Sequence, residues 1–127
     1  EVGTASGAWS SSLRWYAAGN TGHSNDLRGT TTLNANQTYM FSVTYNQSTA
    51  STTMYANATA ISATQAGIGS DSGFSQGNNN YVIGSYQPYF SIYSSMRQYA
   101  VFVYDRALSQ AEITANYDYL KPIYNIS

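Results

Sequence analysis

Residues 101–120 constrain the fold more than any other stretch, because a strand, a turn and a helix follow one another there. Ser109 and Glu112 have the spacing of a capping box, in which each side chain accepts from the other residue's backbone N–H. An apolar stripe then recurs at i, i+4 and i+7: Ile113, Tyr117 and Leu120. We expect Pro122 to end this helix. A helix this short is marginal alone, so its stripe must dock on a β body.

Alternating side chains elsewhere predict that β body. Residues 39–46 alternate bulky and small polar side chains, as a half-buried strand does, and residues 52–56 can return as the hairpin partner. Residues 9–16 predict a first strand with one aromatic face. Residues 98–104 are bulky on both alternating faces, so we expect a final strand that is buried on both faces.

Turn-forming residues separate these strands. Residues 17–30 and 67–80 are rich in Gly, Asn and Ser, and we interpret both stretches as loops. Short strands between such loops are typical of an antiparallel β-sandwich or jelly roll. We therefore predict an all-β fold with one short C-terminal helix, organised as an N-terminal arm (residues 1–7) and a single sandwich domain (residues 8–127).

A family resemblance runs through the same stretches. Residues 104–109 (YDRALS), followed by Glu112, Ile113 and Tyr117, resemble the last strand and terminal helix of laminin-G-like, concanavalin A-like jelly-roll domains. Three earlier segments resemble successive strands of that family in the expected order: residues 39–46 (YMFSVTYN), 53–59 (TMYANAT) and 81–85 (YVIGS). The chain departs from the family at the hairpin, where Asn57-Ala58 replaces the usual Asn-Gly, and it is shorter at the N-terminal side.

The composition limits the classes of partner. Only 9% of the 127 residues are charged, and the formal net charge of −1 lacks the concentrated positive field that nucleic acid requires. No apolar run approaches the ~18–20 residues of a membrane span. A surface of Ser, Thr, Asn, Gln and 13 tyrosines is common in extracellular adhesive proteins and assembled structural proteins. We therefore expect an extracellular or virion surface location, with no nucleic-acid partner and no membrane insertion.

The ionisable residues offer little for catalysis. Some relatives within the concanavalin A-like family are glycosidases, whose reaction needs two carboxylates about 5–10 Å apart. None of the six acidic residues forms an i, i+2 or i, i+4 pair on a predicted strand, and His23 is the only histidine. We predict that the chain is not an enzyme, and glycoside hydrolysis ranks a distant third among its functions. We expect no cofactor. Calcium is the metal candidate, on Asp71 with residues 78–80 or on Asn25 with Asp26, against the simpler interpretation that these residues form turns.

Aromatic and amide side chains supply better material for binding. Sugar rings stack on aromatics while Asn, Gln and Asp accept or donate to hydroxyls, and the same tyrosines suit a protein interface. The candidate glycan-binding or interface residues are Trp15, Asp26, Asn78, Asn80, Tyr86, Tyr89 and Tyr93. For Trp15, packing in the core is the competing interpretation. The candidate structural residues at the strand–helix corner are Asp105, Arg106, Ser109 and Glu112.

These observations favour a non-catalytic structural subunit of a larger assembly, such as a fibre, filament, tail or capsid. Its partners would be neighbouring subunits or other copies of itself, together with glycans or a cell-surface receptor. The alternative is a stand-alone lectin-like carbohydrate-binding module. The short N-terminal side favours the assembly, since an incomplete sandwich leaves sheet edges that a neighbouring chain can complete.

Overall fold

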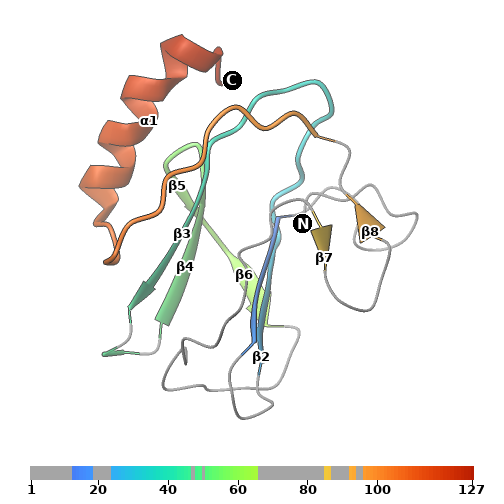
Figure 1. Cartoon of the computed structure of the whole chain (residues 1–127), viewed down its shortest axis with the longest axis vertical. Helices are drawn as coiled ribbons and strands as arrows, with labels where there is room; N and C mark the ends of the chain where they lie inside the picture. The colour runs from blue at the N-terminus through green and yellow to red at the C-terminus, as the bar shows by residue number, and fades with distance from the viewer. Residues whose placement is uncertain are drawn as a thin grey trace.

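The computed structural model (Figure 1) describes residues 13–18, 24–46, 48–49, 51–65, 85–86, 92–93 and 96–127. Within these ranges the fold is mainly β, with antiparallel sheets and a C-terminal helix. The elements in chain order are β1 (Arg14–Ala18), β2 (Ser24–Gly29), β3 (Phe41–Asn46), β4 (Ser51–Ala56), β5 (Thr59–Ile61), β6 (Ala63–Gln65), β7 (Ser85–Tyr86), β8 (Ile92–Tyr93) and α1 (Gln110–Tyr124). The predicted N-terminal arm and the predicted loop at 67–80 lie outside the described residues.

One sheet has the strand order β1-β2-β6, with both strand pairs antiparallel. Trp15 of β1 lies opposite Leu27 of β2, and Tyr16 lies opposite Asp26. β2 occupies residues that we expected to form a loop, so that expectation is wrong. Ladder hydrogen bonds join main-chain groups, and β2 has a partner strand on each side. This pairing outweighs the low strand propensity of its Asn, Asp and Gly residues.

Gly29, at the end of β2, marks a close approach between the two larger sheets. Its N–H donates to the Leu13 carbonyl at 2.8 Å. A Cβ at this position would lie 2.8 Å from Cδ1 of Ile61 in β5 and 3.4 Å from the Leu13 oxygen. The glycine therefore lies at a close packing contact inside a paired strand, and a larger residue here would require the Ile61 side chain to shift.

The other large sheet has the order β3-β4-β5, again antiparallel, with Phe41 opposite Ala56 and Asn46 opposite Ser51. Only Ser62 separates β5 from β6, so one extended stretch pairs with β4 in this sheet and then with β2 in the first. The Thr30 N–H and hydroxyl both donate to the Ser62 carbonyl, at 2.9 and 3.1 Å. These bonds fix the point at which the chain changes sheets.

The central strand β4 is covered on both faces. Met54 and Tyr55 are neighbours, so their side chains point to opposite faces, yet they are only 1% and 7% exposed. Figure 1 shows α1 beside the β3-β4-β5 sheet and away from the β1-β2-β6 sheet. The buried apolar side chains of the described residues are Leu13, Leu33, Met54, Tyr55, Ile113 and Ile126. The core thus combines the two sheets, the helix and the segment that follows the helix.

β4 and β5 are joined by a tight turn at Asn57-Ala58. Both residues have positive φ, 50° and 65°, as the central pair of a type I′ turn requires. Ala56 pairs directly with Thr59, which leaves a two-residue loop. The departure from Asn-Gly therefore does not abolish the hairpin. It places a Cβ in the left-handed region, at a cost of roughly 1–2 kcal/mol.

α1 begins as predicted and ends later than predicted. Ser109 is its N-cap, and Ile113 is fully buried on the inner side of the helix. Pro122 lies inside the helix, which runs on to Tyr124, so the expected stop at Pro122 is wrong. Asn125 then takes a left-handed conformation, and its N–H and that of Ile126 both donate to the Lys121 carbonyl. Burial of Ile126 fixes the last turn and outweighs the hydrogen bond that proline cannot donate.

Asn57 ties the end of the chain to the sheet. Its N–H donates to the Met40 carbonyl at 2.9 Å, and its Oδ1 accepts from the Met40 N–H at 3.0 Å. Its Nδ2 donates to the main-chain oxygen of Ser127. Ser127 in turn donates to the Thr38 carbonyl through its N–H and its hydroxyl. The segment after the helix is thereby held against the start of β3.

Candidate functional site

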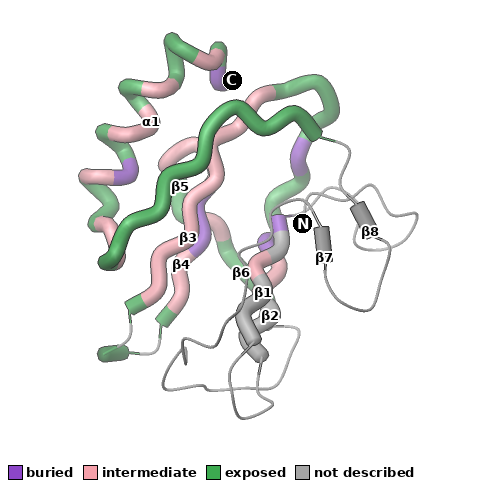
Figure 2. Tube along the Cα trace, in the orientation of Figure 1, coloured by how far each residue is buried: buried purple, intermediate pink, exposed green. Residues whose placement is uncertain are grey.

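Residues 96–104 pass beside α1 and lead into a bend at Asp105-Arg106 (Figure 1). We call residues 96–104 the exposed segment. Residues 98–104 were expected to form a strand buried on both faces, and this expectation is wrong. The exposed segment belongs to no sheet, and every residue in it is exposed (Figure 2). The apolar stripe of α1 takes the covered position beside the sheet, which leaves the exposed segment at the surface.

The exposed segment is apolar as well as accessible. Val103 is 75% exposed and Phe102 is 59% exposed, although they are adjacent and so point in different directions. Its large exposed apolar side chains are Met96, Tyr99, Val101, Phe102, Val103 and Tyr104. Its main chain makes no hydrogen bond to another described residue. Exposed apolar side chains gathered along one segment, unlike single surface hydrophobics, make this segment a candidate interaction site.

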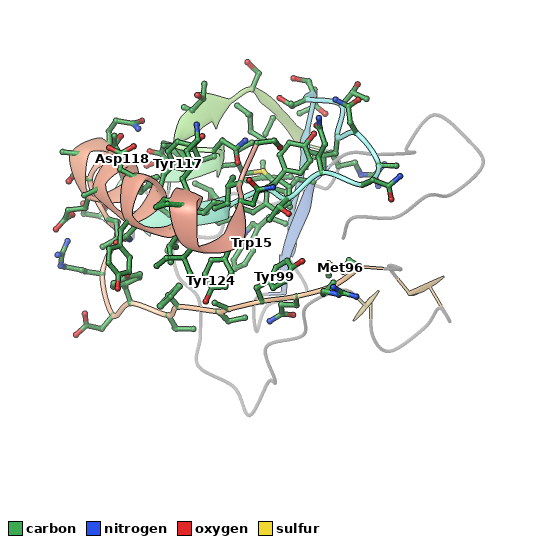
Figure 3. All side chains as sticks on the ribbon, turned by 90° about the horizontal axis from the view of Figure 1, so that it is seen from above. Trp15, Met96, Tyr99, Tyr117, Asp118 and Tyr124 are labelled. Atoms are coloured by element: carbon green, nitrogen blue, oxygen red, sulfur yellow. The ribbon has the colours of Figure 1, made fainter. Side chains whose placement is uncertain are left out.

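Two contacts align the exposed segment with the helix. The rings of Tyr99 and Tyr124 lie 5.5 Å apart between centroids, and Figure 3 shows the two side chains together. Further along, Asn116 Nδ2 donates to the hydroxyl of Tyr104 at 3.1 Å. The exposed segment therefore runs in the direction opposite to α1. Its path is fixed by side chains at both ends, while its backbone groups make no hydrogen bond to the residues that the structure describes.

The bend after the exposed segment is held by an ion pair and a capping box. Arg106 donates through both terminal nitrogens to the Glu112 carboxylate, at 2.9 and 2.6 Å. Glu112 also accepts from the Ser109 N–H at 2.8 Å, and the Glu112 N–H donates to Ser109 Oγ at 3.3 Å. The carboxylate that pairs with Arg106 is therefore that of Glu112, and not that of the neighbouring Asp105.

These hydrogen bonds shift the pKa values of Glu112 and Arg106. The Arg106 guanidinium, followed by the N–H and hydroxyl of Ser109, lowers the pKa of Glu112 from its ordinary 4.5 to about 2. The same hydrogen bond to Glu112 raises the pKa of Arg106. Both side chains are largely solvated, with 59% and 41% of their surface exposed. The pair positions the exposed segment relative to the helix and has no geometry suited to catalysis.

The other candidate residues from the sequence are not brought to this site by the described structure. Trp15 is half-buried in β1, and its Nε1–H is buried without an acceptor among the described residues. Asp26 lies in the middle of β2, opposite Tyr16. In the β7–β8 pair, Tyr86 is opposite Ile92 and Tyr93 is opposite Ser85. The remaining candidates lie outside the described residues: Asp71, Asn78, Asn80 and Tyr89.

The described part of the chain contains no group of three or more His, Asp or Glu side chains that could hold a metal ion. Among the same residues, no helix is long and apolar enough to cross a bilayer. Comparisons with protein-family models, curated proteins and solved structures find no match to this chain. Functional inference therefore rests on the exposed segment and its surroundings.

Sequence reasoning did not identify Arg97 or the exposed segment as a functional feature. Residues 98–104 carry bulky side chains on both alternating faces. This pattern is equally consistent with a strand covered on both sides by its own chain or by a partner. The signal that distinguishes the two is charge. Arg97 and Asp105 flank an uncharged run at 98–104, as charged residues often flank a strand that other chains could pair with.

Proposed function

We propose that this chain is a non-catalytic structural module of a larger assembly at an extracellular or virion surface, and that the exposed segment is one of its subunit contacts. One observation carries the proposal: the exposed segment has apolar side chains in solvent and main-chain groups without partners in the described structure. An extended chain with free N–H and C=O groups is a template for pairing with another chain.

Monomeric proteins usually place a charge or a proline within such a segment. The central residues 98–104 of the exposed segment contain no charge and no proline, the two features that most often block edge pairing. The bend and the helix contacts fix its path, so little conformational entropy remains to be lost on association. These features favour a built contact surface over an accidental exposure.

We also propose that the two larger sheets are the layers of a laminin-G-like sandwich. The support is the order of the resembling segments, the type I′ turn at Asn57-Ala58 and the capped helix after residues 104–109. Glycan or receptor recognition is the activity that we propose for the assembled module. Its support is compositional, from the aromatic and amide residues of 78–93. A glycan array with the Tyr89→Ala variant tests that activity separately from assembly.

Light scattering coupled to size-exclusion chromatography tests the assembly proposal directly. The chain should form oligomers whose mass rises with concentration, and Val103→Lys should reduce this mass to that of a monomer. Ile123→Lys is the matched control, because Ile123 is also exposed (54%) but lies on α1 outside the exposed segment. Oligomers that are unchanged by Val103→Lys, or a chain that remains monomeric throughout, would contradict the proposal.

A further inference from the structure

We infer that the exposed segment pairs with its own copy in a second molecule, as two antiparallel strands related by a two-fold axis at Val101. This inference rests on the proposed function and deepens it, because it names the neighbouring subunit and the register of the contact. It follows from the positions of the charges that flank the exposed segment and from the size of the side chains between them.

The flanking charges are placed symmetrically. Arg97 lies four residues before Val101, and Asp105 lies four residues after it. In an antiparallel pair centred on Val101, each Arg97 is therefore opposite Asp105 of the second copy, so that an ion pair closes each end of the two-stranded ladder. Neither residue forms an ion pair with any residue that the structure describes. Both are exposed and available.

The side chains between the charges are also complementary in this register. Tyr99 lies opposite Val103 of the second copy, an aromatic and β-branched pair of the kind that stabilises antiparallel strands. The smallest residue, Ala100, lies opposite Phe102, one of the largest. Gln98 lies opposite Tyr104. Each large side chain therefore meets a smaller one or an amide, and the axis itself passes between two valines.

Neighbouring registers are less favourable. Moving the second copy by one residue in one direction places Arg97 opposite Arg106, and like charges directly across a strand pair are destabilising. A shift in the other direction places Arg97 opposite Tyr104 and Asp105 opposite Met96, which leaves both charges without a partner. The charge pattern therefore selects the register centred on Val101.

A second copy fits the exposed segment better than the sheet edge at β3. The edge strand β3 (FSVTYN) has no charged residue to meet Arg97 or Asp105. The six large side chains of the exposed segment are each 42–75% exposed. Together they offer on the order of 600 Å² per copy, close to the ~800 Å² per partner of a standard interface.

Single cysteines in the intact chain test the axis, since the chain has no cysteine of its own. In the proposed pair, Val101→Cys places the two thiols directly opposite each other, whereas the two Val103→Cys thiols are separated by four residues of register. Val103 is nevertheless the more exposed position, at 75% against 49%. Under mild oxidation we expect a disulfide-linked dimer from Val101→Cys at least 10-fold faster than from Val103→Cys. Crosslinking by random collision would be faster at the more exposed Val103→Cys, and that result would overturn the inference.

Charge exchange tests the register independently. Arg97→Asp or Asp105→Arg places like charges at both ends of the pair, and each should weaken dimerisation about 10- to 30-fold in sedimentation equilibrium. The double variant restores both ion pairs with reversed polarity and should return the dimerisation constant to within about 3-fold of the original. A double variant that is as weak as the single variants would overturn the register.

The outcomes separate the inference from the function on which it rests. Oligomers with faster crosslinking at Val103 and no rescue by the double variant would refute the two-fold pairing, and the assembly proposal would stand. A chain that stays monomeric at every concentration would refute both. Each variant should retain the helix, because all the substituted side chains are exposed. Circular dichroism checks this expectation.

Discussion

Two neighbouring stretches of this chain differ in whether their main-chain groups are hydrogen-bonded and their apolar side chains buried. In residues 109–127, the helix is capped at both ends, its apolar residue Ile113 is 0% exposed, and the segment after the helix is hydrogen-bonded to Thr38 and Asn57. We call residues 109–127 the closed region. In the exposed segment, the main chain bonds to no described residue and Val103 is 75% exposed. The closed region completes the fold, and the exposed segment is the surface that we propose as a subunit contact.

The comparison teaches that position in the fold, and not apolar content, separates a core element from an interface. The closed region contains Pro122, Asp118 and Lys121, whereas residues 98–104 have no charge and no proline. The more polar stretch is nevertheless the one that is docked. An apolar stripe on one side suffices for a helix to dock, while bulky residues on both faces of a strand need cover on both sides.

The largest expected effect comes from a truncation near the start of α1, within the closed region. Ile113→Ala removes a fully buried side chain and should lower the free energy of unfolding by about 3 kcal/mol in urea titration. Ile123→Ala, on the same helix but 54% exposed, should change it by less than about 0.5 kcal/mol. Equal losses in the two variants would show that the helix is not docked through Ile113.

Asn57→Ala should have the next largest effect, because Asn57 joins the closed region to the sheet. The substitution removes the bonds to Met40 N–H and to the Ser127 oxygen and places alanine at φ 50°. We expect a loss of about 2 kcal/mol by thermal unfolding. Asn57→Asp keeps the acceptor for Met40 and loses the donor, so it should cost roughly half as much. An Asp variant as unstable as the Ala variant would contradict this division.

Ala58→Gly should strengthen the closed region. Ala58 has φ 65°, and its carbonyl accepts from Gln110 Nε2 at 2.7 Å, which connects the turn to the start of α1. Glycine removes the Cβ strain without removing that bond, so the free energy of unfolding should rise by about 1 kcal/mol. The same substitution at Ala60, in the strand β5, should instead lower it by about 0.5–1 kcal/mol. The reverse order would exclude a type I′ turn.

The smallest effect concerns pH. The pKa of Glu112 is lowered from 4.5 to about 2, so the ionised form is favoured in the folded state. Stability from this group is present above pH 4.5 and is lost as the pH falls toward 2. Because the pair is exposed, the change is modest. Glu112→Gln should flatten this part of the stability profile, and a profile that keeps its slope in this variant would contradict the assignment to Glu112.

The sequence predicted the parts of the fold that depend on local chemistry. Ser109 and Glu112 can satisfy each other within one turn, so the capping box is readable from their spacing alone. The alternation in residues 39–46 and the return strand before Asn57 are likewise local, and both are present as β3 and β4. The mainly antiparallel β class followed from these elements.

The missed features depend on contacts between distant residues. β2 contains turn formers, and its strand pairing comes from β1 and β6. Pro122 remains helical because Ile126 is buried beyond it. The exposure of residues 98–104 depends on the helix, and not a strand, lying beside the sheet. The alternation of side chains cannot show whether the helix or a strand lies beside the sheet. The sequence alone therefore predicts a buried strand at residues 98–104.

The bonds of the closed region have a consequence for the order of folding. Gln110 reaches back 52 residues to Ala58, and Ser127 reaches back 89 residues to Thr38. Contacts of such long separation form slowly, because the intervening loop must close before the contact is gained. During synthesis the strands of the two larger sheets are made before the helix that lies beside them. Docking of α1 is thus expected to be a late step in folding.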